Sequence, residues 1–221
     1  MKTPILLLLP MLFCGVPAMA DTIFDNGAHP PTNFPFSDLG AGQILADDFT
    51  LAPGQNTIAD VHWSGRYLDG ALPADAFQIY LCDDVAGAPG NCAALTLAAV
   101  SRTAAGAYFD YTVDVTPLMV PANTVHWLSI FNNTSSWLWG DQVGVGGNSM
   151  QTNNFFGTTP TWALASNGAA MDFSLSGPTA VPAPTSFLLS GIGLAALGFG
   201  RRKPAPAQAS MVASLSGLRM T

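Results

Sequence analysis

Two histidines in a repeated tripeptide are the first residues that could do chemistry. The sequence VHW occurs at residues 61–63 and again at 125–127, so His62 and His126 each precede a tryptophan. A pair of imidazoles is the beginning of a zinc site. Alternation along an extended chain, however, puts each histidine opposite its tryptophan neighbour, on the outer face of a sheet, and nothing in the sequence brings the two together. We therefore predict no metal role for them.

Aspartates in predicted turns offer a second kind of metal chemistry. Carboxylates are the oxygen ligands that Ca²⁺ prefers, and Asp83 and Asp84 stand together at the start of a loop rich in Gly and Pro. Further candidates of the same kind are Asp47, Asp48, Asp69 and Asp75. Because no D-x-D-x-D spacing occurs, solvated turn aspartates explain most of them. The sequence predicts no metal and no cofactor, and a structural calcium at Asp83 and Asp84 stays open as the alternative.

Hydrolytic chemistry has no support in the sequence. The chain contains neither a G-x-S-x-G nucleophile elbow nor an H-E-x-x-H motif. A glycosidase needs two carboxylates at a set separation, and fourteen aspartates without context identify no pair. The GVGG run at 143–146 lacks the lysine of a phosphate-binding loop. We expect no catalytic residues and predict that the protein is not an enzyme.

Aromatic residues gather between positions 137 and 162, in a part of the chain rich in Gly and Asn. They are Trp137, Trp139, Phe155, Phe156 and Trp162. Their rings could stack on sugars while amide side chains bind hydroxyl groups. Trp137 and Trp139, two residues apart, share one face of a strand, which favours core packing. Glycan binding by Trp137, Trp139 and Trp162 is the alternative.

Residues 1–20, MKTPILLLLPMLFCGVPAMA, have the composition of a signal peptide. One positive charge at Lys2 precedes an apolar stretch, and the small residues Ala18 and Ala20 end the segment. Proline and glycine interrupt the apolar run, which makes a first transmembrane helix the weaker alternative. We predict export and cleavage before Asp21 by signal peptidase.

Residues 21–180 then form one exported domain of ordinary size. All fourteen acidic residues of the chain lie here and all are aspartate, whereas the only basic residues are Arg66 and Arg102. Fourteen aspartates against two arginines leave a formal charge of −12. Such a domain repels phosphate backbones, so we exclude nucleic acid as a partner.

Cysteine use agrees with an oxidising compartment. Once Cys14 leaves with the signal peptide, Cys82 and Cys92 remain, and they bracket the loop DDVAGAPGN. An even pair that closes a short loop in an exported domain is typical of a disulfide. We predict a disulfide between Cys82 and Cys92 across the ends of two neighbouring strands.

The elements that must position these residues are β-strands. Period-two alternation dominates the domain and no helical stripe is evident. The predicted strands are 44–51, 58–63, 77–82, 95–101, 108–115, 124–131, 136–140 and 171–176. Turn clusters of Gly, Pro, Asn and Asp separate them at roughly even spacing. This pattern predicts an all-β domain, an antiparallel β-sandwich of jelly-roll type.

Residues 181–203, VPAPTSFLLSGIGLAALGFGRRK, are an apolar run between a Pro-rich element and three basic residues. The uncharged part, 185–200, would form a helix of ~24 Å at ~1.5 Å per residue, shorter than the ~30 Å hydrocarbon core of a bilayer. It is a marginal transmembrane helix. The order of the parts resembles the PEP-CTERM sorting signal of exported Gram-negative bacterial proteins.

The resemblance implies a processing route. In that family an exosortase, a membrane-embedded enzyme, recognises the Pro-rich element and releases or transfers the protein to the cell surface. The recognition element here would be Val181, Pro182, Ala183 and Pro184, and the charges that hold the segment on the cytoplasmic side would be Arg201, Arg202 and Lys203. Two features differ from the usual pattern: Ala183 stands where Glu is usual, and a basic tail, 204–221, which we predict to be disordered, continues after the basic cluster.

The domain resembles uncharacterised exported bacterial β-sandwich domains that carry PEP-CTERM tails. The similarity rests on ADDFTL at 46–51, a D-x-x-G-x-P-G loop at 84–90 and MDFSLSG at 171–177. The loop is made here by Asp84, Gly87, Pro89 and Gly90. The resemblance implies a sandwich and names no activity.

These observations predict an exported protein that passes through an inner-membrane intermediate and ends at the cell surface or outside the cell. We expect a structural or adhesive component of the extracellular matrix or biofilm, without catalysis. Its expected partners are signal peptidase and an exosortase-like enzyme. The alternative is a carbohydrate-binding module whose partner is extracellular polysaccharide.

Overall fold

The computed structural model describes residues 20–178 except positions 28, 69, 71, 135, 158, 166 and 167. The predicted signal peptide up to residue 19, the sorting signal 181–203 with its span 185–200, the tail 204–221 and the calcium candidate Asp69 lie outside the described residues. Within the described part, no helix is long and apolar enough to cross a membrane.

All of the named elements are β-strands, as short segments rich in aromatic and β-branched residues predict. They are β1 (Ala20–Asp25), β2 (Ile44–Thr50), β3 (Thr57–Tyr67), β4 (Gln78–Asp84), β5 (Pro89–Ala94), β6 (Ser101–Ala105), β7 (Tyr108–Met119), β8 (Val125–Phe131), β9 (Trp137–Trp139), β10 (Asp141–Gly146), β11 (Met150–Thr152), β12 (Ala163–Leu164), β13 (Ala169–Met171) and β14 (Phe173–Pro178).

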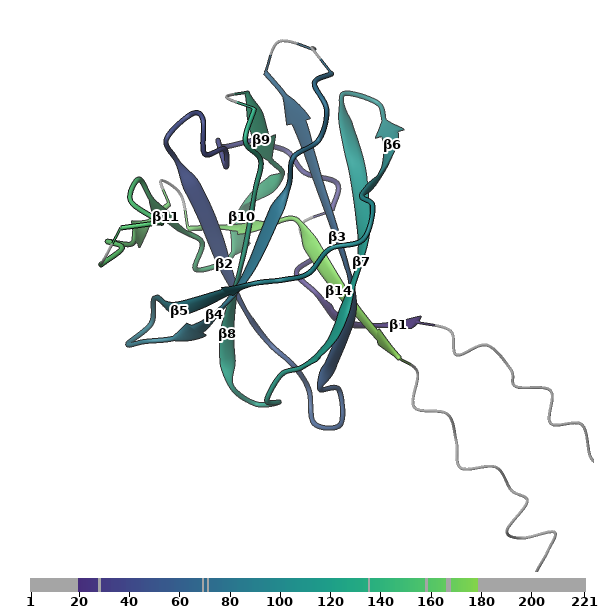
Figure 1. The fold of residues 1–221 in the computed structure, drawn as a ribbon, viewed down its shortest axis with the longest axis vertical. Coiled ribbons are helices and arrows are strands. Elements are labelled where there is room, and N and C mark those ends of the chain that lie inside the picture. The colour runs from purple at the N-terminus through teal and green to yellow at the C-terminus, as the bar shows by residue number, and fades with distance from the viewer. Residues whose placement is uncertain are drawn as a thin grey trace, which may run out of the picture. The chain divides into compact units, whose positions relative to one another are not determined.

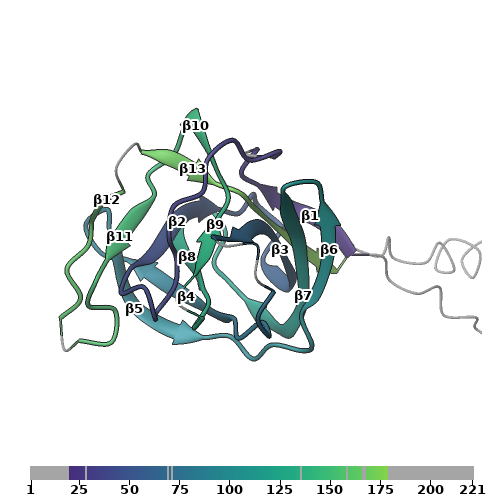
Figure 2. The ribbon, with the colours of Figure 1, turned by 90° about the horizontal axis from the view of Figure 1, so that it is seen from above.

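The strands form two antiparallel sheets that face each other (Figures 1 and 2). The first sheet has the order β1-β14-β3-β7-β6, with β9 also paired to β3. The second sheet has the order β12-β11-β2-β8-β4-β5, and β10 pairs separately with β13. The all-β, sandwich-like prediction is confirmed, and the finer assignment to a jelly roll stays a prediction.

The core between the sheets is built around four aromatic rings, which we call the aromatic cluster. Trp63 on β3 stacks on Tyr111 of β7 with their ring centroids 5.4 Å apart. Phe77, just before β4, meets Trp63 at 5.1 Å and Tyr111 at 4.9 Å. Trp137 on β9 meets Phe77 at 5.0 Å. Because β4 belongs to the second sheet, these contacts join one sheet to the other.

Most of the predicted strands are present. The segments 44–51, 58–63, 77–82, 108–115 and 124–131 coincide with β2, β3, β4, β7 and β8, and 136–140 contains β9. The predicted strand 171–176 is divided, because Asp172 lies between the end of β13 and the start of β14.

The predicted strand 95–101 is wrong. This segment connects β5 of the second sheet to β6 of the first, and only Leu97 forms an isolated bridge, to Val115. Leu95 donates its backbone N–H to Ile79 of the second sheet, and Ala98 donates to Asp114 of the first. The leucines pack against the core as the chain crosses between sheets, so their spacing imitates a strand.

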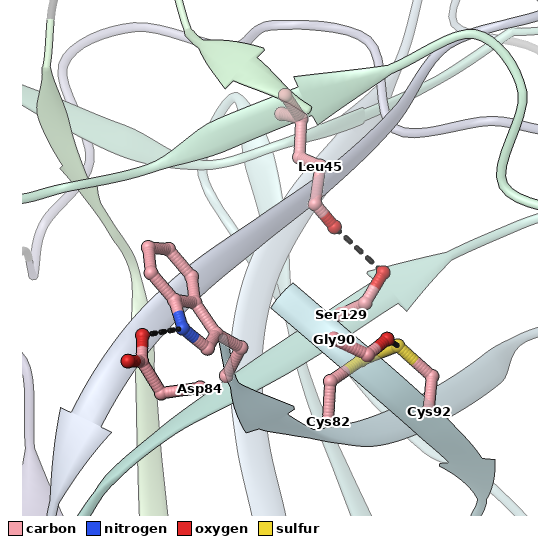
Figure 3. The surroundings of a disulfide bond; sticks show 7 residues. Leu45, Cys82, Asp84, Gly90, Cys92 and Ser129 are labelled. Carbon is pink, nitrogen blue, oxygen red and sulfur yellow. Dashed lines mark hydrogen bonds between the residues drawn. A yellow bond between two sulfur atoms is a disulfide. The ribbon is translucent and has the colours of Figure 1, made fainter. Parts of the chain in front are cut away.

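The predicted disulfide between Cys82 and Cys92 is present (Figure 3). The two residues are directly opposite each other on β4 and β5, ten residues apart in sequence. The sequence suggested a loop between them, but Pro89–Ala94 is strand β5, which pairs with β4. The bond therefore crosses a hairpin near its turn.

Replacing both cysteines, Cys82→Ala with Cys92→Ala, is expected to lower the free energy of unfolding by about 2–3 kcal/mol, because a closed loop of this length restricts the unfolded chain by about that amount. Denaturant unfolding with and without reductant measures the change. The reduced wild-type protein should unfold like the double variant. A reductant effect that persists in the double variant would contradict the assignment.

Candidate functional site

The outward face of the first sheet carries a row of polar side chains because its strands alternate. Val61 and Trp63 point into the core, so His62 between them points outward. Its neighbours across the sheet are Ser174 on β14 and Thr112 on β7. Three stretches of chain that are far apart in sequence therefore meet on this face.

A recess of 460 Å³ opens on this face. Its volume falls within the range of about 300–1,000 Å³ that is typical of small-molecule sites. It is lined by the carboxylates of Asp25, Asp110 and Asp172, the imidazoles of His29 and His62, and the hydroxyl groups of threonine and serine residues. We call this feature the recess.

Asp172 is the most deeply buried carboxylate of the recess, with 7% of its surface exposed. It accepts hydrogen bonds from the Ser64 hydroxyl and from Nδ1 of His29, the latter at 3.1 Å. Burial raises the pKa of Asp172, and the bonds from Ser64 and His29 offset part of that rise. These contacts fasten the segment that follows β1 to the edge of the recess.

The two histidines of the VHW tripeptides lie on different sheets. His62 faces outward as predicted, but the prediction that His126 also does so is wrong, because only 5% of its surface is exposed. His126 is opposite Phe49, a residue of the core, and its Nε2 donates to the backbone carbonyl of Pro121 at 3.1 Å. Strand β8 lies between β2 and β4 in the second sheet, and both of its faces are covered.

The serine, histidine and aspartate side chains around the recess are not arranged as a proton relay. Nε2 of His62 lies 2.7 Å from Asp60 and 3.4 Å from the Ser176 hydroxyl, so one nitrogen meets both partners. A serine hydrolase needs the two ring nitrogens to serve serine and aspartate separately. Asp172 accepts hydrogen bonds from both Ser64 and His29, so His29 does not lie between Ser64 and Asp172.

Of the two calcium candidates Asp83 and Asp84, Asp84 is used in local structure. Asp84 accepts a hydrogen bond from the Trp127 indole at 2.9 Å and another from the backbone N–H of Gly87 at 3.3 Å (Figure 3 shows Asp84). Asp83 is exposed on the same strand. Among the described residues, no group of three or more His, Cys, Asp or Glu side chains could hold a metal ion.

Trp137 and Trp139 are in the core, as the shared strand face favoured, and this removes both from the glycan-binding alternative. Trp137 and Trp139 have no exposed surface, and Nε1 of Trp139 donates to the Asp172 carbonyl at 2.9 Å. Trp162 packs against Phe155 on the outer side of the second sheet and is partly exposed. Beside them the Phe156 ring is 58% exposed. The aromatic surface is thus smaller than the glycan-binding alternative assumed.

Asp47, which the sequence offered only as a further calcium candidate, is a buried carboxylate between the sheets. One of its oxygens accepts hydrogen bonds from the Asn26 amide and from the backbone N–H of Met171, both at 2.7 Å. Burial raises the pKa of Asp47 to about 7, although these bonds act in the opposite direction. Asp47 thereby joins β2 to β13 and to the residue that follows β1.

Comparison with known proteins identifies one feature of the chain. Residues 180–203 match the PEP-CTERM protein-sorting motif. No curated protein and no solved structure matches the chain. The motif implies an exported protein that an exosortase processes and that is sorted to the cell surface. The comparison shows no family for the β-sheet domain that precedes the motif.

The Asp47 carboxyl should make the protein less stable as the pH rises. Its pKa is raised from 3.8 to about 7 in the folded state, so the folded chain binds the proton more tightly than the unfolded chain between these values. The free energy of unfolding is expected to fall from pH 4 to pH 7, and Asp47→Asn should reduce this fall by about 2–4 kcal/mol. Denaturant unfolding at several pH values tests this, with the exposed Asp21→Asn as control. An unchanged pH profile in Asp47→Asn would exclude Asp47 as the cause.

Trp139→Ala is expected to lower the free energy of unfolding by about 3–5 kcal/mol, because it removes a fully buried indole. Trp162→Ala should cost clearly less, since that ring is partly exposed. Chemical denaturation of the two variants gives the comparison. Equal losses, or a larger loss at Trp162, would contradict the placement of Trp139 in the core.

Proposed function

We propose that the protein is a structural or adhesive component of the extracellular matrix or biofilm, without catalysis, that an exosortase delivers from an inner-membrane intermediate. The observation that carries the proposal is the sorting motif at residues 180–203. The last named strand, β14, ends at Pro178, just before the motif begins. The described domain therefore stands immediately before the sorting signal in the chain.

The pairing of the first and last strands supports a domain from which both targeting segments can be removed. Strand β1 begins at Ala20, where we predict the signal peptide to end, and Ala20 is opposite Pro178 at the end of β14 (Figure 1). Both targeting segments are thus joined to one end of the first sheet. Cleavage after Ala20 would remove only the first residue of β1, and cleavage beyond Pro178 would remove nothing from β14.

The absence of catalysis is supported by the way the recess residues bond to one another. His62 meets its serine and aspartate partners through a single nitrogen, and Asp172 is the common acceptor for Ser64 and His29. Such contacts hold side chains in place but activate no nucleophile. A surface component needs a stable exported domain, which the disulfide and the two-sheet core provide.

The sorting step can be tested through the Pro-Ala-Pro element at residues 182–184. Intact mass of the protein from the membrane and extracellular fractions of its host should reveal a species that ends near Val181–Pro184. Changing Pro182 and Pro184 together to alanine should leave the chain full-length in the membrane, whereas restoring the usual acidic residue with Ala183→Glu should raise the processed fraction.

The chain contains its own matched control. Residues 204–206 are a second Pro-Ala-Pro sequence, in the tail after the basic cluster. Changing Pro204 and Pro206 together to alanine makes the same chemical change and should leave processing intact. If the wild-type protein runs to Thr221 in the membrane, the segment is an ordinary anchor and exosortase delivery is overturned.

A further inference from the structure

The recess offers hydrogen-bonding groups that the fold itself does not use. Asp110, Thr112 and Thr103 line it from the adjacent strands β7 and β6, and none of the three side chains has a hydrogen-bond partner among the described residues. They lie beside Asp172, which is held in place by Ser64 and His29. Hydroxyl and carboxylate groups on paired strands are rigid partners for a polar ligand.

The charges around the recess select the kind of ligand. Three carboxylates, Asp25, Asp110 and Asp172, line it. Neither arginine of the domain lines the recess. Arg102 pairs with Asp75 at 3.1 Å, and Arg66 lies over the Phe34 ring. An acidic ligand would meet repulsion here, whereas hydroxyl and ammonium groups would find acceptors.

An aromatic ring stands beside the polar lining. Tyr108 is on the same outward face of β7 as Asp110, and its ring lies 6.1 Å from that of His29 in an edge arrangement. Burial, and then the nearby carboxylates of Asp110 and Asp172, raise the pKa of Tyr108, so its hydroxyl stays protonated and neutral. A flat apolar ring next to fixed polar groups suits a sugar, which has an apolar face and a rim of hydroxyls.

We propose that the recess binds a short saccharide that carries hydroxyl or amino groups and no acidic group. Asp110 and Asp172 accept hydrogen bonds from the sugar, Thr103 and Thr112 complete the polar contacts, and Tyr108 borders the ring. This function is separate from sorting and goes beyond the proposed matrix role, because it gives the displayed domain a ligand. Failure of exosortase delivery would leave it untouched.

A second surface competes with the recess and is weaker. A hollow of 240 Å³ is lined by Gln151, Asn153 and Asn154 among others, and the exposed Phe156 follows Asn154 by two residues in the chain. It is smaller than the range of about 300–1,000 Å³ usual for ligand sites, and much of its lining comes from a loop instead of from paired strands. Phe156→Ala therefore tests whether the sugar binds at this second surface instead of in the recess.

Calorimetric titration of the protein purified from its host, whether processed or full-length, with three trisaccharides tests the proposal. The probes are the trimers of glucose, glucosamine and galacturonic acid, which are neutral, cationic and anionic. The first two should bind and the third should bind at least tenfold more weakly. Raising the salt concentration should weaken only the glucosamine trimer, which separates the contribution of charge from that of the hydroxyl groups.

Asp110→Asn should weaken binding of the neutral and amino trimers about tenfold, the usual effect of losing a charged hydrogen-bond acceptor. The matched control is Asp114→Asn, on the same strand and outward face but outside the recess, which should change affinity less than twofold. Thr112→Val supplies a second variant should Asp110→Asn unfold, and it should weaken binding severalfold.

Four outcomes overturn the proposal. They are no binding of the neutral and amino trimers, equal binding of the acidic trimer, equal losses in Asp110→Asn and Asp114→Asn, and loss of binding in Phe156→Ala alone. The third outcome would mean that the sugar is attracted by the overall negative charge of the protein and not by the recess. The fourth would place the sugar on the second sheet.

Discussion

The aromatic cluster of Trp63, Phe77, Tyr111 and Trp137 is the contact on which the rest of the domain depends. It joins the two sheets, and it has room because Gly65 is on β3: a Cβ at that position would lie 2.6 Å from the Trp137 ring. Once Trp63 and Tyr111 are fixed inward, alternation turns their neighbours on β3 and β7 outward. The recess is therefore a consequence of the core, since the same residues that stack inside determine which polar groups face solvent.

The central strands of the second sheet, β2 and β8, follow a different rule, because both of their faces are buried. Tyr80 on β4 and Phe131 on β8 point away from the main core, and Phe155 packs on them at 4.9 Å and 5.4 Å. A strand covered on both sides reads as a nearly continuous apolar run. This explains why VHWLSIF buries His126 and Trp127 together, while the same VHW tripeptide on β3 leaves His62 exposed.

The sequence was sufficient for properties that depend on neighbouring residues. Alternation located β2, β3, β4, β7 and β8, and the cysteine spacing predicted the disulfide that the structure contains. Prediction from the sequence failed where contacts between distant parts of the chain determine the structure. The segment 95–101 alternates because it crosses the core edge, and His62, Thr112 and Ser174 become neighbours only through pairing of β14, β3 and β7. The polar alternation on each strand was visible, but no local signal gives the register that unites the three.

The strand order of the first sheet also ties completion of the domain to its C-terminus. Strand β14 lies between β1 and β3, so β1 gains its place in the sheet only when β14 has arrived. A chain exported from its N-terminus delivers β14 last, and the sorting motif follows at once. Asp47 strengthens this dependence, because it binds Met171, just before β14, and Asn26, just after β1. The strand that closes the sheet and the sorting motif are consequently adjacent on the same stretch of chain.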